Sequence, residues 1–501
     1  MKYISKKEIY DKNINIIYAK INNMLFINKE LKNTKKILDD IKGYPLDINQ
    51  REAVITDEDN ILLIAGAGSG KTLTIIGKVK YLIEVLKINE NDILCISFTN
   101  DCVNNLKNNL SNYNVDICTF HKLAFDILKS NNKNISICND NLLEYIIDEF
   151  FFTYIGNKKI LYTENYKNIK NLIITFINLF KSSNYNINYF DELFNKIKYS
   201  NEYILLRIIK YVYVTYQLEL KSTMKVDFND MINRAVDIVK NNGNIKKYKY
   251  IIIDEYQDTS IVKYNLITEI KRRTNAKLFA VGDDYQSIYR FSGCTLNIFL
   301  KFNKYYKYSK ILKITNTYRN SNELIDVAGK FIMKNKNQIY KRLKSNKNIN
   351  KPIVIIYTSN IKKVLYKLIN SINTNILLLG RNNNDINEYF TIDNNGYINE
   401  RLRYLTVHKS KGLEEDNVII INLKNEVLGF PSKIESNSII KYVLNEKDSY
   451  PYEEERRLFY VALTRTKNKV YLLVNRNNQS IFVKELIKNY SSNIQIINEL
   501  I

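Results

Sequence analysis

Short apolar runs recur along the chain and are separated by longer stretches in which apolar and polar residues follow helical spacing. Between residues 45 and 129 the runs are NILLIAGAG, DILCISFT and VDICTF. An unbroken apolar run is typical of a strand buried on both faces of a parallel sheet, and alternation of such strands with helices predicts βαβ units. We therefore expect an α/β domain to begin at residue 45, after a helical extension over residues 1–44.

The strand pattern fades between residues 130 and 222, where the sequence becomes helical and aromatic, and it returns in KYIIIDEY and AKLFAVGDD. Residues 223–303 are thus predicted to complete the first α/β domain around a helical insertion. A second domain of the same class is predicted over residues 304–501 from ILKIT, PIVIIY, NILLLG, YLTVH, NVIIINL and KVYLLVN.

The chain carries a large positive charge: 75 lysine and arginine residues oppose 52 acidic ones, which gives +23. A field of that sign favours a polyanionic partner, most simply nucleic acid. Codon bias is an alternative source of the lysines, because the chain is also crowded with Asn, Ile and Tyr, which an AT-biased genome encodes readily. Charge alone leaves both interpretations open.

The five cysteines are scattered and never spaced as C-x-x-C, which argues against a disulfide framework or a zinc site. No apolar run approaches the roughly 18 residues of a membrane span, and the N-terminus lacks the apolar core of a signal peptide. We expect a soluble, cytoplasmic protein with no membrane partner.

Glycine is scarce in this chain, yet three glycines fall within the segment AGAGSGKT, which follows the run NILLI and precedes a helical stretch. A phosphate-binding loop requires this strand–loop–helix context, since glycines let backbone N–H groups converge on a phosphate at a helix N-terminus. Lys71 is predicted to reach the β- and γ-phosphates of ATP, and the Thr72 hydroxyl to bind Mg²⁺. The predicted ATP-binding loop comprises Ala65, Gly66, Ala67, Gly68, Ser69, Gly70, Lys71 and Thr72. The alternative is a glycine-rich turn without a ligand.

The stretch YIIIDEYQDTS carries three isoleucines directly into Asp254 and Glu255. Burying a carboxylate at the end of such a strand costs free energy unless a positive group lies beside it. In a P-loop ATPase an acidic residue at this position helps to hold the Mg²⁺ that bridges the phosphates. Asp254 is therefore predicted to bind the metal, and Glu255 to orient and deprotonate the attacking water. An ordinary acidic helix start is the alternative.

Three further stretches, LFAVGDDYQSIYRFSGC, KSKGLEEDNVIIINL and EEERRLFYVALTRTK, complete a set of motifs in their expected order. With them the chain resembles the UvrD/Rep-type superfamily 1 DNA helicases over residues 45–480, in particular the helicase IV branch. The resemblance implies an α/β fold of two RecA-like P-loop domains with parallel sheets and ATP bound between them. It also implies ATP-dependent 3′→5′ movement on DNA in repair, recombination or replication, with single-stranded and tailed duplex DNA as partners.

The resemblance assigns three contacts to the base and sugar of the nucleotide. Gln50 is similar to a glutamine that binds the adenine edge, Tyr318 to a tyrosine that stacks on adenine, and Glu414 to a carboxylate that binds the ribose. Leu73 stands where many relatives carry an arginine that packs on adenine, so the preference for one base stays open.

Three contacts are assigned to the γ-phosphate. Gln286 resembles a glutamine that senses this phosphate, Arg319 an arginine that binds it, and Arg465 an arginine finger supplied from the second domain. A finger across a cleft contributes fully only when the cleft closes, and one is worth about 10³–10⁵ in rate. Closure and reopening with each ATP would convert hydrolysis into movement.

DNA contacts are assigned by resemblance to the segments SFTND, TFH and YRF and to one further histidine. Phe291 is the leading candidate for stacking on bases, which tolerates any sequence and contributes about 1–3 kcal/mol per base. Burial as a core aromatic is the alternative for this residue. The full set is Phe98, Thr99, Asn100, Thr119, Phe120, His121, Tyr289, Arg290, Phe291 and His408.

Rep and UvrD carry a large helical domain within the second RecA-like domain, between the segments that match Arg319 and Thr406 in this chain. Most of this interval is needed for the core sheet, and only Asn382 to Arg401 remains, which is too short for a domain with its own core. We therefore expect a reduced or absent insertion in the second domain, and a monomer whose ATPase needs only single-stranded DNA.

Three other functions stay open at the level of sequence. The first is a translocase that strips bound proteins such as a stalled RNA polymerase, and the second is the helicase subunit of a phage-defence system or a viral replication factor. The third belongs to another class, an inert scaffold that binds nucleic acid. Intact Lys71, Asp254, Glu255, Arg319 and Arg465 argue against the scaffold.

Overall fold

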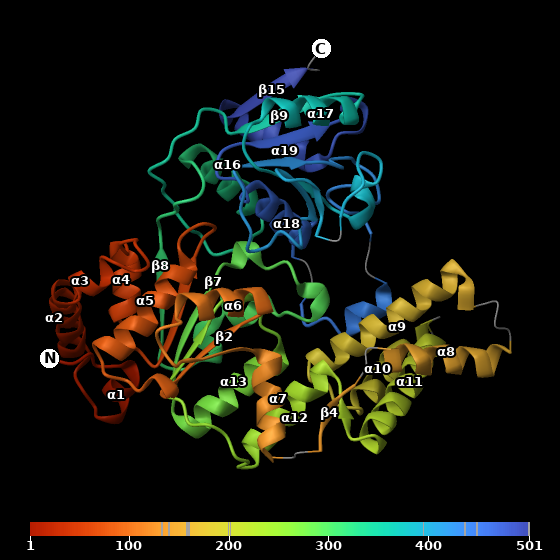
Figure 1. Ribbon diagram of the computed structural model, residues 1–501. Coiled ribbons are helices and arrows are strands. Elements are labelled where there is room, and N and C mark those ends of the chain that lie inside the picture. Colours follow the sequence, from red (N-terminus) through yellow and green to blue (C-terminus); the bar gives the residue numbers. More distant parts are fainter. Residues whose placement is uncertain are drawn as a thin grey trace.

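The computed structural model describes residues 1–131, 134–138, 141–156, 161–198, 200, 202–393, 395–434, 437–446 and 449–498. A few positions of the predicted ranges 130–222 and 304–501 therefore lie outside the described residues. Figure 1 shows two bodies that each contain a sheet, one above the other, with a group of helices beside the lower body. The sheet of the lower body is formed by strands up to Ile314, and the sheet of the upper body by strands from Ile353 onward.

The first sheet has six parallel strands in the order β3-β2-β6-β7-β1-β8. Strands β1, β2 and β6 are buried along their whole length, which is why they read as unbroken apolar sequence. The strands of this sheet are β1 (Asn60–Ala65), β2 (Ile93–Ser97), β3 (Asp116–Thr119), β6 (Tyr250–Ile253), β7 (Lys277–Gly282) and β8 (Ser309–Ile314).

Strand β8 corrects the predicted boundary between the two domains. Its run, ILKIT, was expected to open the second domain, but the strand pairs with β1 from Asn60 opposite Ser309 to Ala65 opposite Ile314. A hydrophobic run indicates that a strand is buried but not which sheet it joins. The first sheet therefore continues beyond residue 304.

Helices cover both faces of the first sheet, because successive strand residues point to opposite sides. Leu62 and Ile64 belong to one core cluster, whereas Ile61 and Leu63 belong to the other. The first cluster includes side chains of α7 (Phe120–Asn131), α12 (Phe228–Lys240), α13 (Ile261–Thr274), α14 (Leu296–Leu300) and α15 (Phe302–Tyr305). The second includes side chains of α4 (Ile48–Ile55), α5 (Lys71–Glu84) and α6 (Asn100–Asn109). The N-terminal extension packs on this second cluster through Phe26 and Leu38. It consists of α1 (Lys6–Asp11), α2 (Ile16–Asn33) and α3 (Lys35–Leu38).

The second sheet has the order β11-β12-β10-β13-β14-β9-β15 and is parallel except for β11. The sequence pattern does not predict β15, because its run IQIIN is short and largely exposed. The strands are β9 (Ile353–Tyr357), β10 (Ile376–Gly380), β11 (Tyr397–Asn399), β12 (Leu402–Thr406), β13 (Asn417–Ile420), β14 (Val470–Val474) and β15 (Ile494–Asn498).

Helices also cover both faces of the second sheet. One core cluster includes side chains of α16 (Asn322–Ile332), α18 (Glu453–Leu463) and α19 (Ile481–Tyr490), and the other includes α17 (Ile361–Ser371). A parallel sheet and a mostly parallel one, each with helices on both faces, confirm the predicted fold class of two RecA-like α/β domains.

The aromatic stretch between the two parts of the first sheet folds into α8 (Asn141–Ile155), α9 (Glu164–Ser182), α10 (Tyr189–Ile197) and α11 (Glu202–Ser222). Their apolar faces share a core of their own, which includes Phe176, Phe180 and Phe190. The chain enters and leaves this helical insertion through β4 (Ser136–Ile137) and β5 (Lys225–Val226), which pair in parallel.

A segment from the second half of the chain completes the core of the helical insertion. We call residues 437–446 the strap; it contains the 3₁₀ helix η7 (Ser438–Tyr442) and lies beside α9 in Figure 1. Ile439, Ile440 and Val443 are buried among the side chains of α8–α11. The Tyr189 hydroxyl donates to the Tyr442 carbonyl at 2.8 Å. The sequence pattern does not reveal this contact, because the partners lie far apart along the chain.

The interval from Asn382 to Arg401 contains the 3₁₀ helix η6 (Asn383–Ile386) and strand β11, which pairs with β12. Among the described residues this interval adds an edge strand to the second sheet and forms no core of its own, as the predicted reduced insertion requires. A search of the described helices finds none that is both long and apolar enough to cross a membrane.

We predict that Ile439→Ala destabilises the helical insertion by about 2–5 kcal/mol, because it leaves a cavity in a closed core. Ile439 is 0% exposed, whereas Ile434 in the same connection is 62% exposed, so Ile434→Ala is the matched control and should change stability by about 0.5 kcal/mol or less. Urea unfolding followed by circular dichroism measures both. Equal midpoints for the two variants would contradict the packing of the strap.

Candidate functional site

The loop between β1 and α5 has the backbone of an anion site. Gly68 and Gly70 have φ values of +68° and +78°, in the left-handed region that favours glycine. A Cβ on Gly70 would lie 2.6 Å from Gln50 Nε2, so the loop leaves no room for a side chain there. The helix α5 begins at Lys71, and the buried Ser69 hydroxyl has no hydrogen-bond partner. Free N–H groups at a helix N-terminus and an unpartnered hydroxyl fit a phosphate group.

Lys71 faces the two carboxylates that end β6. Its Nζ lies 2.7 Å from Glu255 Oε1, and Glu255 adopts φ +49°, an uncommon backbone conformation for a non-glycine residue. Burial opposes ionisation of Glu255, yet Lys71 and Lys411 lower the pKa of its carboxyl to about 2. Burial and the charge of Glu255 raise the pKa of Asp254 to about 6. Glu255 is therefore readily ionised, whereas ionisation of Asp254 is disfavoured unless a further cation binds.

Thr72 and Asp254, the predicted metal ligands, follow the P-loop lysine and β6. Within the described part of the chain, no cluster of three or more His, Cys, Asp or Glu side chains is arranged to hold a metal ion. Mg²⁺ is commonly bound through one or two protein oxygens together with substrate phosphates and water. One hydroxyl and one carboxylate therefore fit a Mg²⁺ ion that arrives with a nucleotide.

Arg465 reaches from the end of α18 to the first domain. Its Nη2 donates to Gln286 Oε1 at 3.0 Å, and its Nη1 donates to the Leu413 carbonyl at 3.0 Å. Burial, and then the charge of Arg319, lower the pKa of the Arg465 guanidinium to about 9. The structure thus brings the predicted finger into contact with the predicted γ-phosphate sensor.

The residues predicted for the base, sugar and γ-phosphate gather beside the P-loop. Gln50 donates to the Ser69 carbonyl at 3.1 Å and accepts from the Asp47 N–H at 2.8 Å. Tyr318 is exposed, and its hydroxyl donates to Asp47 Oδ2 at 2.9 Å. Arg319 Nε donates to Glu414 Oε2 at 2.5 Å, a contact within the part of the chain that follows β8.

An exposed aromatic group lies where the two domains meet. Phe291 is 58% exposed, and its ring centroid is 5.6 Å from that of His408. The Tyr289 hydroxyl donates to the His408 carbonyl at 3.1 Å. Arg290 Nε lies 3.2 Å from Glu454 Oε2 of α18. Burial, then Arg381 and Lys411, lower the pKa of His408 to about 4, so this ring is neutral at pH 7.

Sequence comparisons agree with this geometry. Residues 46–307 match the model of the UvrD/REP helicase N-terminal domain, which covers more than half of the chain. Residues 365–477 match the model of the UvrD-like helicase C-terminal domain. The chain belongs to the UvrD/REP helicase family.

Curated relatives in this family include DNA helicase IV of Escherichia coli (strain K12), which is 27% identical over 491 residues, covering 90% of this chain and 71% of the relative. ATP-dependent DNA helicase Rep of Buchnera aphidicola subsp. Schizaphis graminum (strain Sg) is 28% identical over 454 residues, covering 87% and 66%. ATP-dependent DNA helicase PcrA of Leuconostoc citreum is 28% identical over 316 residues, covering 59% and 40%. The chain thus spans between 40% and 71% of these UvrD/REP-family relatives.

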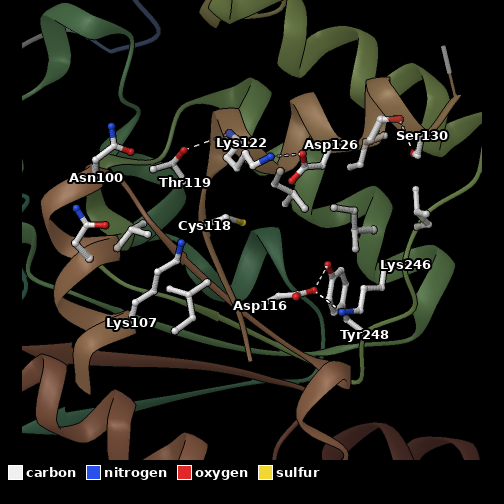
Figure 2. Close-up of a pocket in the computed structure, with 17 residues that line it drawn as sticks. Asn100, Lys107, Asp116, Cys118, Thr119, Lys122, Asp126, Ser130, Lys246 and Tyr248 are labelled. Carbon is white, nitrogen blue, oxygen red and sulfur yellow. Dashed lines mark hydrogen bonds and ion pairs between the residues drawn. The ribbon is translucent and has the colours of Figure 1, made fainter. Parts of the chain in front are cut away.

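The other DNA-binding candidates of this UvrD/REP-family chain differ in accessibility. Thr99 and Asn100 are exposed at the start of α6, and Figure 2 shows Asn100 and Thr119 at a pocket of about 710 Å³ beside the edge strand β3. Three lysines also line this pocket: Lys107, Lys122 and Lys246.

Two aromatic candidates and one histidine, Phe98, Phe120 and His121, are partly or fully buried. Phe120 is 1% exposed, and its ring centroid lies 5.2 Å from that of Phe98. The His121 ring packs on Phe228 at 5.2 Å, and burial followed by Lys263 lowers the pKa of His121 to about 4. The Phe120 side chain, grouped with the DNA contacts by the sequence motif, is not available at the surface in this structure, because the motif gives no information on which side of α7 it points.

Sequence reasoning missed Lys411 and its partners. Lys411 Nζ lies 2.5 Å from Asp258 Oδ2 and donates to the Gln286 carbonyl at 2.7 Å, so it binds both acidic turns of the first domain from the second. The sequence signal that could have identified Lys411 was its place in the segment KSKGLEE. Asp258 precedes it by 153 positions, and no local pattern relates the two.

Proposed function

We propose that this chain is an ATP-driven motor that moves 3′→5′ along single-stranded DNA and separates duplex strands ahead of it. The observation that carries the proposal is the contact of Arg465 with Gln286, which joins the second domain to the nucleotide side of the first. Membership of the UvrD/REP helicase family supports DNA as the substrate.

The P-loop lysine and Glu255 have separate roles in hydrolysis under this proposal. Lys71 pairs with Glu255 in the structure, and a nucleotide phosphate would compete for the same ammonium group. Release from Lys71 removes the main charge that lowers the pKa of Glu255, so its carboxylate becomes a better acceptor for a proton from water. A Mg²⁺ ion held by Thr72 and Asp254 would supply positive charge to the phosphate oxygens.

Arg465 couples hydrolysis to the relative position of the two domains. It reaches Gln286 only across the junction, so its contribution to the γ-phosphate depends on how closely the second domain approaches. An arginine finger is worth about 10³–10⁵ in rate. The γ-phosphate would therefore favour closure of the two domains before hydrolysis. After hydrolysis Arg465 loses this partner, and closure is no longer favoured.

Phe291 is the proposed contact with bases. It is exposed on the first domain beside His408 of the second, so a change at the junction alters the surface that a base would meet. Base–aromatic stacking contributes about 1–3 kcal/mol per base and needs no particular sequence. The net charge of +23 supports attraction of the DNA backbone.

A strand-displacement assay tests the function. We expect ATP-dependent displacement from a duplex with a 3′ tail and none from one with a 5′ tail. Lys71→Ala should abolish hydrolysis and displacement while single-stranded DNA binding persists, because this lysine addresses phosphates of ATP. Displacement from the 5′-tailed duplex alone would overturn the polarity, and DNA-stimulated hydrolysis without displacement would favour a protein-stripping translocase.

Glu255→Gln should bind nucleotide but lower kcat by about 10²–10⁴-fold, since an amide keeps the shape of the side chain and cannot accept the proton of water. Single-turnover hydrolysis with excess DNA measures this rate. Glu269→Gln, which changes a half-buried carboxylate paired with Arg272 on α13, is the control and should retain the wild-type rate. Retention of most of the kcat by Glu255→Gln would remove this residue from the role of base.

Phe291→Ala should uncouple the motor, so that DNA-stimulated hydrolysis survives better than strand displacement. The ratio of base pairs separated to ATP hydrolysed measures the coupling. Tyr366→Ala removes another exposed aromatic side chain, on α17, and should leave the ratio unchanged. A parallel loss of both rates in Phe291→Ala would indicate a packing role instead.

A further inference from the structure

Two adjacent carboxylates are buried directly after β7. Asp283 and Asp284 are each 0% exposed, and Lys341, from the connection between α16 and β9, pairs with both. The lysine side chain is itself buried, and its Nζ lies 3.4 Å from the centroid of the Tyr285 ring. Two carboxylates in this environment repel each other and lose hydration, so they require a positive partner.

The same connection holds the 3₁₀ turn η4 (Asp284–Gln286) at a second point. Gln338 Nε2 and the Ile339 N–H donate to Asp284 Oδ2 at 2.7 and 2.8 Å. Asp283 Oδ1 accepts from the Tyr285 N–H at 3.1 Å. The turn that carries Gln286 is thus fixed by residues from beyond the first sheet as well as by its own backbone.

The amide of Gln286 is engaged at both ends. Its Nε2 donates to Asp283 Oδ2 at 2.7 Å, and its Oε1 accepts from Arg465 at 3.0 Å. An amide has one donor end and one acceptor end, so a carboxylate that binds the donor end directs the oxygen towards the arginine. A continuous polar path therefore runs from Lys341 through Asp283 and Gln286 to Arg465.

The position of Lys341 is fixed relative to the P-loop. A Cβ on Gly66 would lie 2.6 Å from Leu343 Cδ1, which shows how closely this connection approaches the loop. The Lys344 N–H donates to the Thr315 carbonyl at 2.8 Å, and the Thr317 N–H donates to the Lys344 carbonyl at 2.8 Å. Thr317 Oγ1 in turn donates to the Ala67 carbonyl at 2.7 Å. Lys341 is therefore anchored to the same frame as the phosphate site.

We propose that Lys341 is a positioning residue for ATP hydrolysis, which holds Asp283 so that Gln286 directs its oxygen to Arg465. The inference rests on the proposed function, in which Gln286 and Arg465 act on the γ-phosphate. Lys341 itself touches neither nucleotide nor water in this role. Its removal should lower kcat more than it changes nucleotide binding, because the groups it positions act in the transition state.

The first test compares Lys341→Met with Lys341→Arg in the full-length chain. Lys341→Met should lower the kcat of DNA-stimulated ATP hydrolysis by about 10- to 100-fold, the cost of a small misplacement of a reacting group, with little change in the affinity for ADP. Lys341→Arg retains the charge and should recover most of the rate. Wild-type kcat in Lys341→Met would overturn the proposal.

A matched control separates positioning from stability. Lys181 is also buried, pairs with two carboxylates, Asp227 and Asp230, and lies 5.0 Å from the ring centroid of Tyr216, away from the P-loop residues. Lys181→Met should lower the thermal midpoint as Lys341→Met does but leave kcat unchanged. If Lys341→Met does not fold, Lys341→Met/Asp284→Asn removes one unpaired carboxylate, and its kcat should still be low.

A double-mutant cycle with Gln286→Ala identifies the route of the effect. If Lys341 acts through Gln286, then Lys341→Met should change kcat by less than about twofold in the Gln286→Ala background. Full additivity of the two losses would overturn the proposal, because it would mean that Lys341 acts independently of Gln286.

A crystal structure of Lys341→Met provides a readout that does not depend on turnover. The distance from Gln286 Oε1 to Arg465 Nη2 should increase beyond hydrogen-bonding range in the variant and remain near 3.0 Å in the wild type. A preserved contact in the variant overturns the positioning role. If the wild-type chain does not hydrolyse ATP, the proposed function is wrong instead. The distance from Gln286 Oε1 to Arg465 Nη2 in the variant still tests whether Lys341 positions Gln286.

Discussion

The junction of the two domains is organised by the need to neutralise buried carboxylates. Four of them follow the carboxyl ends of β6 and β7, namely Asp254, Asp258, Asp283 and Asp284, and the partly buried Glu255 lies next to Asp254. Three lysines form ion pairs with these carboxylates: Lys71 from the P-loop, and Lys341 and Lys411 from the second half of the chain. Removing one partner of a buried ion pair costs about 3–5 kcal/mol, so Lys341 and Lys411 fix the second domain against the first.

The proposed nucleotide site lies among these carboxylates and lysines. Lys71 has Glu255 as its partner in the structure, and burial, followed by the charge of Glu255, raises the pKa of Asp254. Phosphate groups would compete with Glu255 for Lys71, and a magnesium ion would favour the ionised form of Asp254. Lys411, which pairs with Asp258 across the junction, also acts on the charges of Asp254 and Glu255, so the proposed motor can couple nucleotide binding to domain closure there.

Apolar contacts also cross the junction, since Tyr285 and Ile288 of the first domain belong to a core cluster of the second. The strap from the second half of the chain completes the core of the helical insertion through Ile439, Ile440 and Val443, and Asn445 donates to the Ser183 and Thr295 hydroxyls. Any rotation of the second sheet against the first has to be accommodated by this strap or by the insertion. The insertion is thus connected to both sheets, although the chain enters and leaves it from the first sheet alone.

The sequence alone determined the P-loop, the acidic strand end at Asp254 and the buried central strands, because each depends on glycine spacing or on an unbroken apolar run that is local in the chain. Tertiary structure decided which sheet β8 joins, that Phe120 lies inside while Phe291 lies outside, and that the strap closes the helical insertion. It also decided which carboxylates Lys341 and Lys411 neutralise. The physical reason is common to these cases: hydrophobicity and charge show that a residue needs a partner, but a partner distant in sequence is chosen only when the chain is packed.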